Sequence, residues 1–185
     1  MASPTERNTT ESFIQWIPPP EGWFKLNVDG ASKGNPGPAG AGGILRGQYG
    51  NWIRGFALNI GICTFVKGEL TALLHGLKLA RNQGIAKLIV HTDSQVVFRK
   101  LKVPSTKNRA YFYLIRKCQE LLNNPAWEVV AEHCYRESNQ AADFLAKIGS
   151  LQSSAFVIFE APPDPLRKIL AVDNLCVAWP RAITF

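Results

Sequence analysis

Cysteine and histidine are scarce in this chain, and neither is clustered. Four cysteines occur without any C-x-x-C pair, and there are only three histidines. Such widely spaced thiols favour reduced cysteines inside a cell over a disulfide framework or a zinc site. The cysteines are Cys63, Cys118, Cys134 and Cys176.

Long apolar runs are also missing. No stretch approaches the roughly 18 residues that a membrane-spanning helix needs. Glu6 and Glu11 make the first residues unlike a signal peptide or an acidic-poor transit peptide. We therefore expect an intracellular protein of the nucleus or cytoplasm, with no membrane partner.

Acidic residues are outnumbered by basic ones, which gives a net charge of +7 over 185 residues. The excess lies between residues 23 and 150, with 17 Lys or Arg against 8 Asp or Glu. Positive charge confined to the central segment suits a polyanionic partner, and a basic surface without a specific partner explains it equally well.

Composition along the chain predicts three parts. Residues 1–22 are polar and then rich in proline, and we interpret them as an extended N-terminal tether. Residues 23–150 form the expected central folded domain. Residues 151–185 are interpreted as a C-terminal appendage with one short helix over residues 165–171, where Asp164 precedes Pro165 as cap and first helical residue.

The central part alternates between two hydrophobic periods. Phe24, Leu26 and Val28 alternate with polar residues, as in a half-buried strand, and strands at 41–46 and 52–58 complete an antiparallel meander. A helix at 67–82, a strand at 87–92, helices at 94–101 and 109–122, a strand at 127–133 and a helix at 139–148 follow. A right-handed crossover places strand 87–92 parallel to the first strand. The prediction is an α/β fold with a mixed five-stranded sheet flanked by helices.

Four acids stand at the ends or starts of these elements: Asp29, Glu69, Asp93 and Asp143. Singly, each has an ordinary explanation, as a turn residue, a first-turn helix acid, an N-cap or a partner of Lys147. Gathered together, they would repel one another unless a cation neutralised them. Hard oxygen ligands suit Mg²⁺ or Mn²⁺, and two such ions can support in-line hydrolysis of a phosphodiester.

Four segments in a fixed order carry a family resemblance. They are NVDGASKGNPG at 27–37, GELTAL at 68–73, HTDSQ at 91–95 and RESNQAAD at 136–143. Over residues 23–150 the chain resembles the type 1 ribonuclease H domain, most closely the reverse transcriptase-like form derived from plant non-LTR retroelements. The resemblance implies a ribonuclease H-like fold and an endoribonuclease that cuts the RNA strand of RNA–DNA hybrids, leaving a 3′-hydroxyl and a 5′-phosphate.

The same resemblance assigns roles to individual residues. It implies two Mg²⁺ ions, with Mn²⁺ as a substitute, held by Asp29, Glu69, Asp93 and Asp143. It makes His133 an aid to proton transfer or product release from a flexible loop, with an ordinary surface histidine as the alternative. Substrate contacts are implied for Gly30, Ser32, Asn35, Thr64, Gln95 and Asn139, of which Asn35 and Gln95 match minor-groove positions and Thr64 a DNA-phosphate position.

Two departures from the family pattern lower the affinity for substrate that we expect. Phe65 and Val66 replace an asparagine pair before the helix glutamate, and the extra basic helix of many bacterial members is missing. Binding would then depend on phosphate contacts, with steep salt sensitivity. The basic residues available are Lys33, Arg99, Lys100, Lys102, Lys107 and Arg109.

The expected partner is an RNA–DNA hybrid, with double-stranded nucleic acid as a second candidate, bound by a monomer. Two rival functions stay open: a nucleic-acid-binding module with poor turnover, and a protein-interaction scaffold domesticated from a retroelement.

Overall fold

The computed structural model describes residues 9–103 and 111–184. Lys107, Arg109 and the predicted start of the helix at 109 lie outside the described residues. The strands are β1 (Thr9–Ile14), β2 (Phe24–Ser32), β3 (Gly37–Arg46), β4 (Trp52–Cys63), β5 (Lys87–Thr92), β6 (Glu128–His133), β7 (Phe156–Phe159) and β8 (Trp179–Thr184). The helices are α1 (Phe65–Asn82), α2 (Gln95–Leu101), α3 (Phe112–Leu122), α4 (Gln140–Leu151) and α5 (Leu166–Asn174), with the 3₁₀ turn η3 (Arg136–Ser138) before α4.

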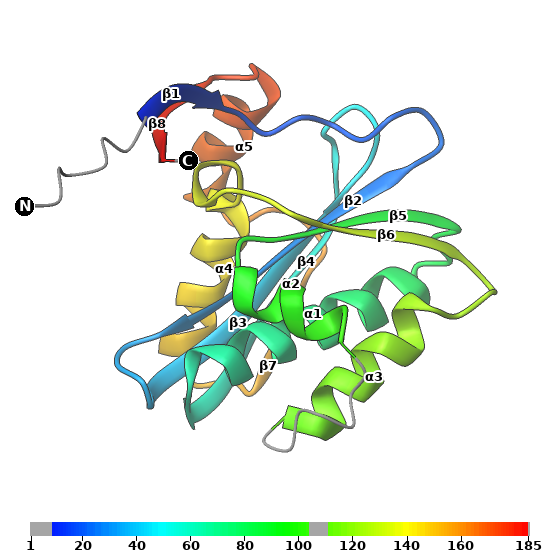
Figure 1. Ribbon diagram of the computed structural model, residues 1–185, viewed down its shortest axis with the longest axis vertical. Helices are drawn as coiled ribbons and strands as arrows, with labels where there is room; N and C mark the ends of the chain where they lie inside the picture. Colours follow the sequence, from blue (N-terminus) through cyan, green and yellow to red (C-terminus); the bar gives the residue numbers. More distant parts are fainter. Residues whose placement is uncertain (1–8, 104–110, 185) are drawn as a thin grey trace, which may run out of the picture.

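A mixed sheet in the order β6-β5-β2-β3-β4-β7 forms the centre of the molecule (Figure 1). Strands β2, β3, β4 and β7 pair antiparallel, whereas β5 pairs parallel with both β2 and β6. The predicted mixed sheet is confirmed, but it has six strands, whereas five were predicted. The missed strand β7 is only four residues long and pairs with the outer edge of β4.

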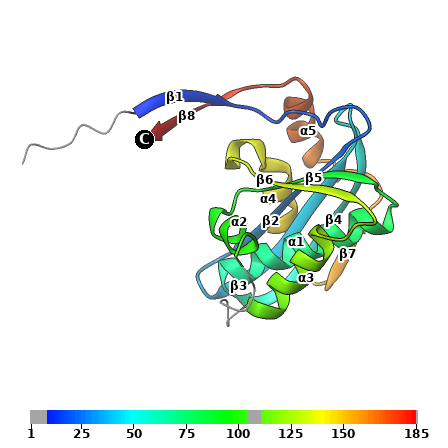
Figure 2. The same cartoon turned by 45° about the vertical axis from the view of Figure 1, so that its right-hand side comes forward.

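Helices cover both faces of this sheet (Figures 1 and 2). Helix α1 packs on the face that carries Leu26 and Val28, close enough that a side chain at Gly76 would meet both. Helix α4 packs on the opposite face, where a side chain at Gly42 would lie 2.2 Å from the backbone nitrogen of Ala146. No described helix has the length and apolar character needed to cross a membrane.

Strand β2 is buried on both faces, so the half-buried strand of the prediction is wrong. Lys25 is 5% exposed and Asn27 is fully buried, although both belong to the polar half of the alternation. The cover comes from the N-terminal segment and from α4. The Trp16 indole donates a hydrogen bond to Asn27 Oδ1 at 3.0 Å, and Asn139, which precedes α4, accepts one from the Asn27 amide.

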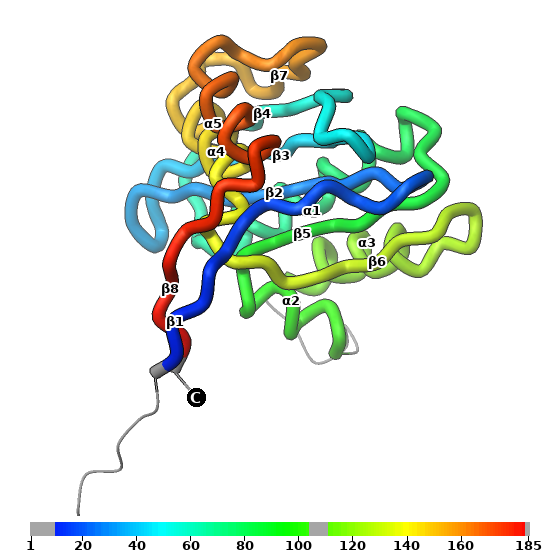
Figure 3. The backbone as a smooth tube through the Cα atoms, turned by 90° about the horizontal axis from the view of Figure 1, so that it is seen from above, coloured from blue at the N-terminus to red at the C-terminus, as the bar shows by residue number. Residues whose placement is uncertain are grey.

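The two ends of the chain are more ordered than a tether and an appendage. Strands β1 and β8 pair antiparallel as a separate two-stranded ribbon, which extends from the body of the molecule (Figure 3). Trp16, within the predicted tether, is only 2% exposed. The predicted helix at 165–171 is observed as α5, and it buries Leu166 and Leu170 against α4 and β3.

Candidate active site

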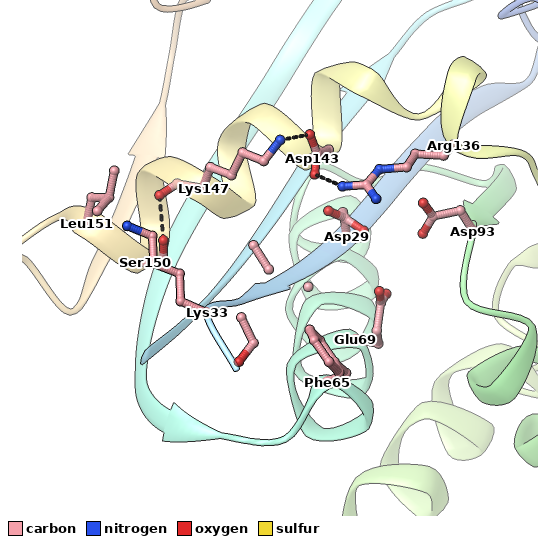
Figure 4. A pocket seen from close by; sticks show the side chains of 13 residues that line it. Asp29, Lys33, Phe65, Glu69, Asp93, Arg136, Asp143, Lys147, Ser150 and Leu151 are labelled. Carbon is pink, nitrogen blue, oxygen red and sulfur yellow. Dashed lines mark hydrogen bonds and ion pairs between the residues drawn. The ribbon is translucent and has the colours of Figure 1, made fainter. Parts of the chain in front are cut away.

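Three of the four predicted acids meet at one end of the sheet. Asp29 lies in β2, Asp93 directly follows β5, and Glu69 is on the first turns of α1. Because β2 and β5 run parallel with Val28 opposite Thr92, the next residues along both strands are neighbours. One carboxylate oxygen from each of the three acids lies within 4.8 Å of the others, and Figure 4 shows the three side chains around a shared space.

Glycine at position 30 makes this meeting possible. A Cβ at Gly30 would lie 2.4 Å from both Glu69 N and Gly68 C, so any side chain there would push α1 away from β2. Gly68 faces it from the helix. The absence of a side chain at Gly30 therefore sets the distance between Asp29 and Glu69.

Crowding and burial shift all three acids toward their protonated forms in the absence of a cation. Burial, and then the charges of Asp93 and Asp143, raise the pKa of Asp29 to about 8. Burial, and then Asp29 and Asp93, raise the pKa of Glu69 well above its usual value. Burial likewise raises the pKa of Asp93.

The donor set fits a hard divalent cation. Among the described residues, Glu69 Oε2 is buried without a hydrogen-bond partner. A buried carboxylate oxygen without a donor is costly, and a cation shared with Asp29 and Asp93 removes both that cost and the mutual repulsion. Among the described residues the close group consists of carboxylates alone, and such hard oxygen ligands match Mg²⁺ or Mn²⁺.

Asp143 stands at the edge of this cluster. It lines the same hollow from α4, but it is outside the close group of three oxygens. Its carboxylate pairs with Arg136 at 3.3 Å and with Lys147, four residues along the helix (Figure 4). Asp143 therefore shows both features considered from the sequence. It pairs with Lys147, and it lies beside the other acids.

The acids lie in a hollow of about 430 Å³ that also has Lys33, Phe65 and Leu151 in its wall. A second hollow, of about 420 Å³, shares Asp93 and Arg136 with the first. The two hollows therefore adjoin at Asp93 and Arg136, and we refer to them together as the groove.

Three of the six predicted substrate contacts line this groove. Gly30 and Ser32 line the first hollow, and Gln95 lines the second. Asn35 is exposed, and its Oδ1 accepts a hydrogen bond from the backbone N–H of Phe65 at 3.1 Å. Thr64 caps α1 and shares a hydrogen bond of 2.7 Å with the Tyr111 hydroxyl.

Asn139 is a correction, because it is built into the fold and does not reach the groove. It is 1% exposed, and its amide donates to the backbone oxygen of Val28 at 3.0 Å. Its Oδ1 accepts from Asn27 Nδ2 at the same distance. Both ends of the side chain are thus occupied in the core.

His133 lies at the end of β6, whereas the resemblance implied a flexible loop. The ring faces the second hollow, with Nε2 at 3.2 Å from the backbone oxygen of Asp93. Tyr135 packs edge-on against it and Phe98 packs at a tilt. The histidine is therefore beside the acids but outside their group.

Two basic residues of the groove were missed by the sequence. Arg136 lies within a family motif, and its place seven residues before Asp143 was the available signal. Arg181 reaches the second hollow from β8, and no sequence pattern connects it to the acids.

Comparison with known proteins shows which family this chain belongs to. Residues 27–149 match a family model described as reverse transcriptase-like. A candidate ribonuclease H protein of Arabidopsis thaliana is 38% identical over 94% of this chain, which spans only 28% of that protein's length. The ribonuclease H of Coxiella burnetii is 33% identical, with 67% of this chain and 87% of the relative covered.

Solved structures give the same result. RNase H1 of Halobacterium salinarum matches with a TM-score of 0.63 and 29% identity, over 69% of this chain and 96% of that one. LC11-RNase H1, solved in complex with an RNA/DNA hybrid, matches with a TM-score of 0.58 and 25% identity, over 68% and 94%. Fold and site together define a domain of the ribonuclease H class of enzymes. Within that class, the chain belongs to the reverse transcriptase-like family.

Proposed function

We propose that this domain hydrolyses the RNA strand of RNA–DNA hybrids with the help of divalent cations, two Mg²⁺ ions or Mn²⁺ in their place. The observation that carries the proposal is the convergence of Asp29, Glu69 and Asp93, with one buried carboxylate oxygen left without a partner among the described residues. The relatives named as ribonucleases H support the reaction, and the hybrid bound to LC11-RNase H1 supports the substrate.

Asp29, Glu69 and Asp93 would hold the cations, and Asp143 would join them by exchanging its pairs with Arg136 and Lys147. When bound, such ions supply neutralisation of charge on the reacting phosphate. Lys33 and Lys147, two of the basic side chains in the wall, would hold backbone phosphates on one side of the cut.

Discrimination between RNA and DNA would come from the polar groups beside the acids. The 2′-hydroxyl is the group that distinguishes the two strands, and it both donates and accepts hydrogen bonds. Ser32 and Gln95 lie in the two hollows next to Asp29 and Asp93, so they are placed to receive it. His133 faces the same hollow as Gln95, and its imidazole can donate or accept a hydrogen bond there.

The test is cleavage of an end-labelled hybrid with Mg²⁺ and again with EDTA, beside single-stranded RNA, duplex RNA and duplex DNA. We expect cleavage of the hybrid only, and only with the metal. Asp93→Asn should lose at least about 100-fold in rate, since it removes a ligand of the cation. Asp164→Asn is the matched control, because Asp164 is exposed and pairs only with Arg167 on α5 among the described residues.

A second candidate function is hybrid binding with little turnover. It is favoured by Phe65, which is 46% exposed and lines the hollow where the family has a polar residue. Tight binding of the hybrid with no Mg²⁺-dependent cleavage would select this function. A protein that neither binds nor cleaves hybrid or duplex at low salt would leave the scaffold role.

A further inference from the structure

The second hollow is closed on one side by a residue from outside the family region. Its walls come from the start of α2, from residues 133–136 and from Arg181 of β8. Arg181 lies beyond residues 27–149, the span that matches the family. The ribbon formed by β1 and β8 thus contributes a side chain to the groove at the end away from Lys33 and Lys147.

Arg181 is held at this position by two contacts. Its Nη1 donates to both carboxylate oxygens of Glu137, at 2.8 and 2.7 Å. Its guanidinium lies 4.6 Å from the centre of the Tyr135 ring, and Tyr135 in turn packs against His133. The Tyr135 ring therefore contacts both the Arg181 guanidinium and His133, the histidine that lies beside the acids.

The contacts leave Arg181 able to take another anion. Both hydrogen bonds to Glu137 use Nη1, and Arg181 and Glu137 keep 37% and 27% of their side-chain surface exposed. An ion pair with this exposure contributes little to stability, so it can be exchanged at low cost. The planar guanidinium matches a phosphate as well as it matches a carboxylate.

We propose that Arg181 binds a backbone phosphate of the nucleic acid on the His133 side of the acids. The ribbon β1–β8 is then part of the substrate-binding surface, and Arg181 adds a second positive charge to the hollow that Arg136 also lines. This inference rests on the proposed function, because it needs the hybrid to lie in the groove.

The experiment measures hybrid binding without metal, by fluorescence anisotropy, over a range of salt concentrations. Arg181→Ala should weaken binding about fivefold to tenfold at low salt and reduce the slope of log K against log salt by about 1. Arg181→Lys should recover part of the affinity. The matched control is Arg167→Ala, which removes an exposed arginine of the same C-terminal segment that pairs with Asp164, and it should change nothing.

Glu137→Gln separates a phosphate contact from a simple fastening of the ribbon. If Arg181 binds phosphate, freeing it from Glu137 keeps or raises the affinity. If the pair only fastens the ribbon, Glu137→Gln weakens binding as much as Arg181→Ala, and the inference is overturned. Thermal unfolding of each variant shows whether the fold is intact.

Failure of this inference is distinct from failure of the proposed function. Equal binding by Arg181→Ala and Arg167→Ala, with cleavage intact, rejects the role of Arg181 alone. A parent protein that neither binds the hybrid nor cleaves it with Mg²⁺ rejects both.

Discussion

The fold holds each carboxylate of this site in surroundings where its charged form is energetically unfavourable. Asp29 is 5% exposed and lies beside two further acids, so its charge is opposed by burial and by its neighbours. Binding sites with strongly shifted acids are where a ligand of opposite charge gains most. The burial and crowding that raise the pKa of Asp29 thus destabilise the ionised site in the metal-free protein, and a bound cation would relieve them.

The first prediction concerns the pH dependence of stability without metal. The pKa of Asp29 is about 8 in the folded protein and 3.8 when unfolded, so between these values only the folded state holds the proton. Stability therefore falls as pH rises toward 8, by up to about 1.4 kcal/mol per pH unit from this one group. His91, whose pKa is lowered to about 4 in the folded protein, has the opposite effect: below pH 6.5 it makes stability rise with pH. Urea unfolding in EDTA between pH 6.5 and 8 should show the decline.

Asp29→Asn should flatten this decline, and Asp164→Asn should leave it as in the parent. Added Mg²⁺ should stabilise the parent more at pH 8 than at pH 6.5, because the cation binds the ionised carboxylates. Equal slopes for the parent and Asp29→Asn would contradict the prediction.

The second prediction uses the two facing glycines. Gly30→Ala places a methyl group 2.4 Å from backbone atoms of α1, and such overpacking costs about 1–3 kcal/mol. It should also abolish the rise in melting temperature that Mg²⁺ produces, since Glu69 moves away from Asp29. Gly68→Ala is the control, because its new methyl meets Gly30 only at 3.7 Å and alanine favours a helix. Thermal unfolding with and without Mg²⁺ compares the two, and similar losses would refute the assigned geometry.

At the scale of elements, α4 is fastened to the sheet in a way that fixes where Asp143 lies. Gly40 and Gly42 of β3 let the helix backbone approach the strand, since side chains there would meet Ala146 and Ser150 at about 2.2 Å. Asn139, just before the helix, joins it to β2 by two hydrogen bonds. The position of Asp143 beside the other acids follows from these contacts.

The third prediction is that Asn139 acts through stability. Asn139→Ala removes the acceptor of the Asn27 amide and a donor to the Val28 carbonyl, both of them buried, which costs about 1–3 kcal/mol in urea unfolding. Gln140→Ala, whose side chain only donates to the Glu137 backbone oxygen among the described residues, is the neighbouring control and should cost less. Hybrid affinity per folded molecule should be unchanged in both. Weaker binding at full stability would restore the substrate-contact role implied by the family.

How well the sequence predicted each element depends on which residues carry the information that specifies it. Period-2 and helical spacing located β2, α1 and β5, because each has a long apolar pattern of its own, and the parallel pairing then predicted that Asp29 and Asp93 are neighbours. Strand β7 was missed because four residues give no clear period. The burial of Asn27 was missed because it depends partly on Asn139, which is 112 positions away. Trp16, which contacts both Lys25 and Asn27, lies in the segment predicted to be an extended tether.

At the scale of the whole molecule, the two ends of the chain complete the core. Arg46 is 1% exposed; it pairs with Asp173 of α5 at 2.7 Å and stacks at 3.5 Å on the Trp16 ring. Residues from the N-terminal segment, the sheet and the C-terminal helix thus meet around one buried charge. The predicted boundary at residue 150 separates Arg46 from its counter-ion.

The fourth prediction follows from that buried pair. Burial lowers the pKa of Arg46 to about 10 and raises that of Asp173, so removal of both ions from water opposes the pair even as they attract. Asp173→Ala leaves the buried arginine without its counter-ion and should cost about 3–5 kcal/mol in urea unfolding, whereas Asp164→Ala should cost under about 0.5 kcal/mol. Replacing both partners by Arg46→Met and Asp173→Leu should recover most of the loss, since an apolar pair needs no counter-ion. If the double variant is no more stable than Asp173→Ala, the cost lies in lost packing of α5, and the charge of Arg46 is not what ties the C-terminal segment to the catalytic domain.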